Sequence, residues 1–255
     1  MNTLSNDSVI DICKFLDTCS LIALVSTCKQ FRKLIDKIQI NGIVEYRLVK
    51  NLPFSKIFIN LLVETIDELH LINTSRNTFG NLSLTFRSRF DRPVTLPASL
   101  RNLTFGYCFN QPVILPASLQ SLTFGFHFNQ PITLPASLQS LTFGNHFNQP
   151  ITLPVSLQSL TFGFRFNQPI TLPASLQSLT FGDRFNQSVT LPAALQSLTF
   201  GSYFNQPVTL PAGLQSLTFG YCFNQPVEWP KSLQKLTIRV DYQYALPASV
   251  DIIKI

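Results

Sequence analysis

The sequence predicts an α+β protein in which a short helical module precedes a parallel β solenoid. Two observations support this prediction. A 19-residue unit recurs from about residue 90 to residue 240, and residues 4–37 show helical spacing of apolar side chains without that repeat. A short fixed period is typical of a solenoid, in which each unit buries its apolar side chains against its neighbours. We therefore divide the chain into a helical module at 1–40, a junction at 41–64 and a solenoid at 65–255.

The composition limits the classes of protein to which the chain can belong. Hydrophobic residues make up 45% of its 255 residues, which excludes disorder, while charged residues make up 13%, about half the usual share. Between residues 102 and 227 the charged side chains are limited to Arg165, Asp183 and Arg184. The formal charge of +6 therefore comes mainly from the two ends, and we expect no nucleic-acid partner. The longest apolar run in the first fifty residues, 21–25, is too short to span a membrane.

The cysteines and the N-terminus favour the cytoplasm or the nucleus. Cys108 and Cys222 occupy equivalent positions six units apart, which is too far for a disulfide. Cys13, Cys19 and Cys28 lack C-x-x-C spacing and a nearby histidine, so we expect no metal site and no cofactor. Free thiols fit a reducing compartment, and the N-terminus shows no signal peptide.

Residues 4–37 predict three short helices. Ser5-Asn6-Asp7 supplies N-cap oxygens before a periodic apolar stretch, and Ser20 can cap a second helix. A third helix carries Phe31 and Leu34 at helical spacing. Three helices in about 35 residues bury little surface, so we expect this module to need a partner.

The order and spacing of these residues resemble an F-box. The matching segments are Leu4-Ser5-Asn6-Asp7, Val9-Ile10, Phe15-Leu16, Leu21-Ile22-Ala23-Leu24-Val25-Ser26 and Phe31-Arg32-Lys33-Leu34. Ser5 replaces the usual proline of the motif, and Phe31 stands where tryptophan is common. The resemblance implies that the module binds the Skp-type adaptor of a cullin ubiquitin ligase through an apolar surface. The residues that we assign to this adaptor-binding surface are Leu4, Val9, Ile12, Leu16, Leu21, Leu24, Val25 and Phe31.

Each 19-residue unit predicts one strand followed by an extended return leg. The unit 134–152 contains the Leu-x-x-Leu-x-Leu strand signature of leucine-rich repeats, here Leu138-x-x-Leu141-x-Phe143. Alternation along a strand directs the last two of these side chains inward, and Ser140 and Thr142 outward. We expect Gly144 to permit the turn that follows. Two prolines per unit hold the return leg extended, and 19 residues leave no room for a full helix.

The strand signature extends beyond the clearest copies. Ile66-x-x-Leu69-x-Leu71 predicts the first strand, and Val250-x-x-Ile253-x-Ile255 predicts the last. We expect eleven strands in all, and their centres are residues 69, 84, 103, 122, 141, 160, 179, 198, 217, 236 and 253. In the junction, the apolar run 57–63 could form either a strand or a packed helix.

The unit also resembles the FNIP repeat, named for its Phe-Asn-(Ile/Gln)-Pro core. Phe-Asn-Gln-Pro begins at Phe109, Phe128, Phe147, Phe166, Phe204 and Phe223. Two copies deviate from this core, at Phe90 and Phe185. An F-box followed by FNIP repeats is an arrangement known from social amoebae and amoeba-infecting giant viruses. The resemblance therefore implies a chain of that type, located in the host cytoplasm if it is viral.

Two polar residues recur in register along the array. The asparagines are residues 110, 129, 148, 167, 186, 205 and 224, and the glutamines are residues 120, 139, 158, 177, 196 and 215. An asparagine column can satisfy backbone groups at the turn, because unpaired buried polar groups are costly. We expect a structural role for the asparagines and a solvated surface row for the glutamines.

Two adjacent positions after the glycine vary freely between copies, and we call them the first and second variable columns. The first variable column consists of Ser88, Tyr107, Phe126, Asn145, Phe164, Asp183, Ser202 and Tyr221. The second consists of Arg89, Cys108, His127, His146, Arg165, Arg184, Tyr203 and Cys222. A core position would resist an exchange of Phe for Asp, so packing does not dictate these side chains.

The variable columns contain the candidate target-binding residues. The second column carries two histidines and two arginines on four consecutive units, and two phenylalanines stand beside them. The six residues are Phe126, His127, His146, Phe164, Arg165 and Arg184. Arginine and aromatic side chains are common in binding hot spots, and an acidic or phosphorylated segment suits the arginine fork. Neighbouring positive charges should disfavour protonation of the histidines. The alternative is drift on a surface loop after recent duplication.

The sequence favours a binding protein over an enzyme. His127 and His146 lack a carboxylate partner and a third metal ligand, and the array has neither a phosphate-binding loop nor an H-E-x-x-H motif. We expect a non-catalytic F-box substrate receptor, monomeric before assembly, that holds a target protein near the ubiquitin-transfer machinery. One alternative is a ubiquitin-independent interaction solenoid with a helical cap. Another is an ice-binding surface formed by the Ser and Thr rows, which the lack of a secretion signal disfavours.

Overall fold

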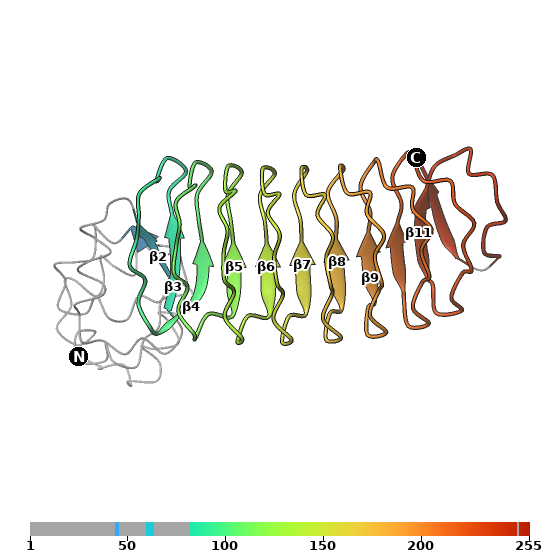
Figure 1. Cartoon of the computed structure of the whole chain (residues 1–255). Helices are drawn as coiled ribbons and strands as arrows, with labels where there is room; N and C mark the ends of the chain where they lie inside the picture. Colours follow the sequence, from blue (N-terminus) through green and yellow to red (C-terminus); the bar gives the residue numbers. More distant parts are fainter. Residues whose placement is uncertain (1–43, 46–59, 64–81, 249) are drawn as a thin grey trace, which may run out of the picture.

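A computed structural model of the chain describes residues 44–45, 60–63, 82–248 and 250–255. These residues form one twelve-stranded sheet in which every strand pairs with the next strand along the chain. All of the pairings are parallel, and the strands lie side by side along an elongated array (Figure 1). The described part of the chain is therefore a parallel β solenoid, as the repeat predicted.

The strands are short, and half of the twelve share one sequence. The N-terminal four are β1 (Val44–Glu45), β2 (Asn60–Val63), β3 (Leu82–Phe86) and β4 (Leu100–Thr104). Six Ser-Leu-Thr strands follow, namely β5 (Ser121–Thr123), β6 (Ser140–Thr142), β7 (Ser159–Thr161), β8 (Ser178–Thr180), β9 (Ser197–Thr199) and β10 (Ser216–Thr218). The last two are β11 (Lys235–Ile238) and β12 (Asp251–Lys254). Pairing is in register with the 19-residue period, as in Leu141 opposite Leu160, and the nine predicted strand centres from 84 to 236 are confirmed.

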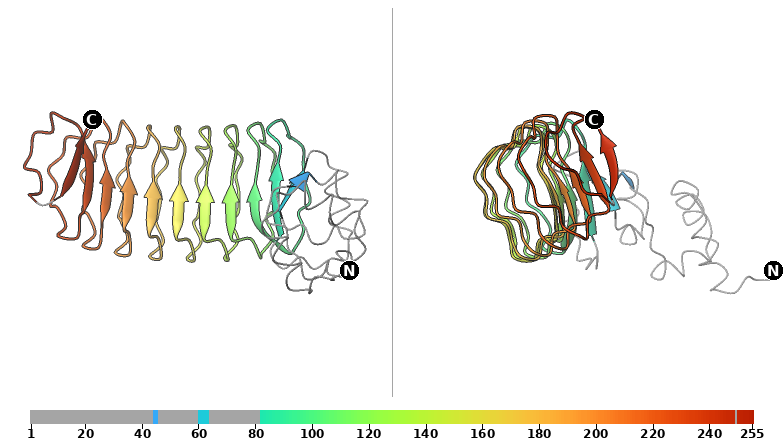
Figure 2. Two further views of the ribbon diagram at one scale, coloured as in Figure 1. Left: turned by 180° about the vertical axis from the view of Figure 1, so that it is seen from behind. Right: turned by 90° about the vertical axis from the view of Figure 1, so that its right-hand side faces the viewer.

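The strands form one wall of the solenoid and the return legs form the opposite wall. The view along the array shows this cross-section (Figure 2, right). In β6, Leu141 is buried, whereas Ser140 and Thr142 are partly exposed, which confirms the predicted alternation. The return leg, residues 147–154 in this unit, contains neither helix nor strand.

Four stacked columns of apolar side chains fill the space between the two walls. In the unit of β6 they are Leu138, Leu141, Phe143 and Phe147, each at most 2% exposed. The two phenylalanine rings of this unit stack with centroids 3.7 Å apart, and Phe143 lies 5.6 Å from Phe162 of the next unit. Aromatic pairs favour offset arrangements at centroid separations of about 4.5–7 Å, and the contact between units falls in this range. Each unit thus buries its core mainly against its two neighbours, which is why a single unit could not fold alone.

The glycine after each strand is required by close packing between units. A Cβ atom added to Gly163 would lie 2.3 Å from the carbonyl oxygen of Gly144 and 2.7 Å from the Cα atom of Asn145. Among the described residues no glycine has a positive φ angle. We expected this glycine to permit the turn, and the structure adds the physical reason: the backbone of the preceding unit occupies the space of a side chain.

The two ends of the sheet depart from the prediction. The strand beside β3 is β2, with Leu61 opposite Leu84, so the sheet begins within the range 41–64 that we assigned to the junction. The strand predicted around residue 69 lies outside the described residues. At the other end, Ile252 opposes Leu236, so the predicted centre at Ile253 is wrong by one residue. Ile253 lies opposite the partly exposed Thr237 and is itself 54% exposed. The sequence between β11 and β12 no longer keeps the 19-residue spacing that fixed the earlier registers.

The predicted three-helix module and its adaptor-binding residues at 1–40 lie outside the described residues.

Candidate binding edge

The two variable columns lie in the turns that directly follow the strands. In the unit of β6 this turn is formed by Asn145 and His146. The turns are joined from unit to unit by backbone hydrogen bonds: the N–H of His146 donates to the carbonyl of Phe126 at 2.9 Å, and that of Arg165 donates to Asn145 at 2.9 Å. The freely varying side chains therefore form continuous columns along one edge of the solenoid, which we call the turn edge.

Aromatic side chains of the first variable column contact one another and the second column. The ring of Phe126 stacks on Tyr107 with centroids 4.7 Å apart, and it also lies 4.7 Å from the ring of His146. Further along, the guanidinium carbon of Arg184 lies 5.2 Å from the ring centroid of Phe164, within cation–π range. Phe164 is 37% exposed and could contact a partner.

The histidines of the second variable column form a direct pair. Nδ1 of His127 lies 3.3 Å from Nδ1 of His146, so one ring must donate to the other and the two facing nitrogens cannot both be protonated favourably. Burial lowers the pKa of His146, and the positive charges of Arg165 and His127 lower it further. This direction agrees with our expectation for His146. The lowered pKa favours the uncharged form of the His146 ring, which lies against the ring of Phe126.

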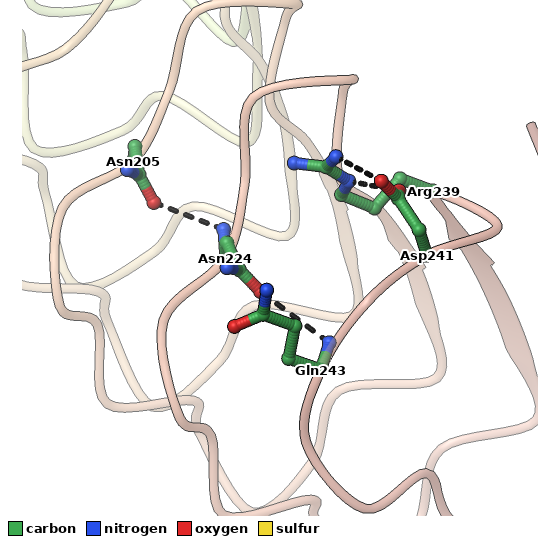
Figure 3. Close-up of polar contacts among 5 residues, drawn as sticks. All are labelled: Asn205, Asn224, Arg239, Asp241 and Gln243. Atoms are coloured by element: carbon green, nitrogen blue, oxygen red, sulfur yellow. Dashed lines mark hydrogen bonds and ion pairs between the residues drawn. The ribbon is translucent and has the colours of Figure 1, made fainter.

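The asparagines form a ladder that satisfies backbone groups, as predicted. Oδ1 of Asn148 accepts a hydrogen bond at 2.9 Å from the backbone N–H of Asn167, and the same bond recurs between successive units. Figure 3 shows the last steps, in which Asn205 accepts from the N–H of Asn224 at 2.9 Å and Asn224 accepts from Gln243 at 3.4 Å. The neighbouring Arg239–Asp241 ion pair lies on the loop after β11.

An open hollow of about 470 Å³ lies between the second variable column and the asparagine ladder. It is lined by Asn148, Arg165, Asn167, Arg184, Asn186 and Tyr203. Of the six predicted target-binding residues, the structure therefore brings the two arginines together at one hollow and places His127, His146 and Phe126 in a separate aromatic cluster. Phe164 joins the hollow indirectly, through its contact with Arg184. Tyr203 is a residue that the sequence analysis did not assign to the site.

A column of serines, for which the sequence predicted no role, also links successive units. The hydroxyl of Ser137 lies 2.6 Å from each of the carbonyl oxygens of Ala117 and Leu119 on the preceding unit, and Ser118, Ser156, Ser175 and Ser232 make equivalent bonds. Ala194 and Gly213 occupy this position in two units and lack the hydroxyl. The glutamines, by contrast, are mainly exposed, as predicted for a surface row.

The groups of the described residues that could hold a metal ion are dispersed. No three His, Cys, Asp or Glu side chains among them gather closely enough to hold a metal ion. Cys108 and Cys222 are free thiols. Within the same residues, no helix is both long and apolar enough to cross a membrane.

The described residues form a leucine-rich-repeat-like parallel β solenoid whose sequence varies along the turn edge. The FNIP Repeat model matches overlapping segments at 90–127, 128–165, 147–184, 166–203, 185–222 and 204–240, which together span more than half of the chain. The chain therefore belongs to the FNIP repeat family. The F-box domain model matches residues 1–41.

Comparisons with individual proteins add little to this assignment. A search of curated proteins found no match. Among solved structures, the crystal structure of CroV588, described as a novel circular LRR protein structure, is 25% identical to this chain with a TM-score of 0.37. The match covers 78% of this chain and 50% of that one, so the chain spans about half the length of CroV588.

Proposed function

We propose that the chain is the non-catalytic substrate-recognition subunit of an SCF-type cullin ubiquitin ligase. The observation that supports this role most directly is the F-box match at residues 1–41 in the same chain as a stacked array whose variation is concentrated on one edge. An F-box implies a Skp-type partner. A solenoid supplies an extended surface suited to holding a second protein. The chain acts by proximity in the cytoplasm or the nucleus, is monomeric before assembly, and binds its target through the turn edge.

The first test measures binding of the purified full-length chain to a purified Skp-type adaptor by isothermal titration calorimetry. We expect a complex with one adaptor per chain. Replacing Leu16 and Leu24 together by Glu should abolish it, because burying an uncompensated charge in an apolar contact costs several kcal/mol, about 3 or more. Far-UV circular dichroism verifies that the array of the variant remains folded.

A matched control replaces Arg165 and Arg184 by Gln, far from the F-box in sequence, and should leave adaptor binding unchanged. If the wild-type chain fails to bind the adaptor, or the Leu16→Glu, Leu24→Glu variant binds as tightly as wild type, the ubiquitin-ligase role is wrong. The chain would then act as a ubiquitin-independent interaction solenoid.

A further inference from the structure

The hollow on the turn edge gathers hydrogen-bond donors without a carboxylate among its lining residues. Arg165 and Arg184 are both exposed, and neither has an ion-pair partner within the described part of the chain. Their units are neighbours in the sheet, separated by the usual strand spacing of about 4.8 Å, so both guanidiniums can reach one ligand. Contact with the Phe164 ring restricts where Arg184 can lie.

The asparagine wall of this hollow also presents donors. A backbone N–H can only donate, so the atom of each asparagine that faces the ladder must be Oδ1. In Asn148 and Asn167 this oxygen accepts from both the next backbone N–H and a glutamine Nε2. Among the described residues the Nδ2 groups of these asparagines make no other hydrogen bond, so what they can offer a ligand is a donor. The hydroxyl of Tyr203 can add one more.

The nearest carboxylate is directed to another partner. Asp183 is the sole acidic residue between residues 102 and 227, and it precedes Arg184. Its Oδ1 accepts from the backbone N–H of Ser202 at 3.1 Å and from the Ser202 hydroxyl at 3.0 Å, and Asp183 does not line the hollow. The hollow therefore retains the positive charge of its two arginines.

We infer that this hollow binds a phosphorylated serine or threonine side chain on an extended segment of the target protein. The two guanidiniums balance the nearly two negative charges of a phosphate monoester. Its three terminal oxygens can accept hydrogen bonds from both guanidiniums, from the asparagine Nδ2 groups and from the Tyr203 hydroxyl. The exposed rings of Phe164 and Tyr203 can contact residues beside the phosphate. This inference rests on the proposed role of the turn edge in target binding.

The small number of charges favours a peptide over a nucleic acid. Across residues 102–227 the basic side chains that are always charged are Arg165 and Arg184 alone. A protein that binds duplex DNA through six to ten phosphates loses affinity steeply as salt rises. A plot of log affinity against log salt concentration then falls with a slope of about 0.9 for each phosphate contacted. Two arginines predict a slope of about two.

The test measures binding of fluorescently labelled degenerate peptide mixtures to the full-length chain by fluorescence anisotropy. The mixtures carry a fixed central phosphoserine, serine or glutamate. We expect the phosphoserine mixture to bind at least about tenfold more tightly than the serine mixture, and Arg165→Gln with Arg184→Gln to remove at least about tenfold of that affinity, since each charge-assisted hydrogen bond is worth roughly one tenfold step or more. Tyr203→Phe, which removes one neutral hydrogen bond, should weaken binding by roughly twofold to tenfold.

The matched control removes the same total charge outside the variable columns, by replacing the exposed Lys231 and Lys254 with Gln, and should leave affinity within about twofold because distant charges are screened. The arginine positions hold His, Cys or Tyr in other units, so the variants should fold. The inference is wrong if the phosphoserine and serine mixtures bind equally, if both double variants lose the same affinity, or if a DNA duplex binds more tightly than the phosphopeptides. Adaptor binding is measured on the same samples, so failure of the phosphate site and failure of the F-box role are distinguished.

Discussion

Close packing of units through the post-strand glycine gives the sharpest prediction of stability. In a Gly163→Ala variant the new Cβ would lie 2.3 Å from the carbonyl oxygen of Gly144, whereas real Cβ contacts essentially never fall below 3.0 Å. The two units would therefore have to separate by at least about 0.7 Å at this point. The adjacent hydrogen bond from the N–H of Arg165 to the carbonyl of Asn145, now 2.9 Å, would lengthen to about 3.6 Å and be lost.

Overpacking of this kind costs about 1–3 kcal/mol, and the lost hydrogen bond adds about 0.5–1.5 kcal/mol. We expect Gly163→Ala to lower the free energy of unfolding by about 2–4 kcal/mol. The chain offers a matched control in Gly213, where an added Cβ would meet its nearest atom, the carbonyl oxygen of Ala193, at 3.7 Å. Gly213→Ala should be neutral or stabilising by up to about 1 kcal/mol, because alanine restricts the unfolded chain.

Denaturant unfolding of both variants is followed by far-UV circular dichroism for the whole array and by fluorescence of Trp229, the single tryptophan, for the C-terminal units. Because long repeat arrays can unfold in stages, hydrogen exchange of the Arg165 amide supplies a local measurement. Equal unfolding midpoints for the Gly163→Ala and Gly213→Ala variants would refute the packing argument.

Three further predictions concern the ladder, the period and the histidine pair. Asn167→Ala should destabilise the array by about 1–3 kcal/mol in denaturant unfolding, because the N–H of Asn186 loses its acceptor. Asn167→Asp should retain this hydrogen bond, as Asp91 does with the N–H of Asn110. Equal losses of stability in the two variants would contradict the ladder's role. Deleting one whole unit, residues 134–152, should leave a folded array by circular dichroism, whereas deleting nine residues should disrupt the register; equal tolerance would contradict the 19-residue period. Because the folded state lowers the pKa of His146, stability should be highest above the unfolded pKa of 6.5 and fall as the pH drops below it. His146→Gln should reduce this dependence, measured as the unfolding midpoint at neutral and at acidic pH, and an unchanged dependence would count against it.

The interior of the array could be predicted from the sequence because every unit repeats the same local pattern. Alternation identified Leu141 as inward-facing, and the recurrence of Phe147 in each copy identified a buried column. The last strand was misplaced because Ile252 and Ile253 both satisfy an apolar pattern once the spacing after β11 changes. Pairing to Leu236, which the sequence does not reveal, selects the first of them.

The candidate site was predicted in part. Free variation between copies identified the turn edge and the two arginines, since packing does not constrain those positions. Spacing could not reveal that the hollow extends to Tyr203 and the asparagine ladder, because this depends on which way each side chain turns from its backbone. The serine column was missed for the same reason: the carbonyl oxygens that Ser137 contacts belong to a segment about twenty residues away.

We propose that the two binding surfaces act independently: the F-box binds the adaptor, and the turn edge binds the target. The most direct test is quantitative affinity capture from the native cell with wild type, the Leu16→Glu, Leu24→Glu variant and the Arg165→Gln, Arg184→Gln variant. We expect the first variant to lose the Skp-type adaptor and the cullin while keeping the target protein. We expect the second variant to lose the target protein while keeping the adaptor and the cullin. Capture of the adaptor by all three chains, or loss of the same proteins from both variants, would contradict this proposal.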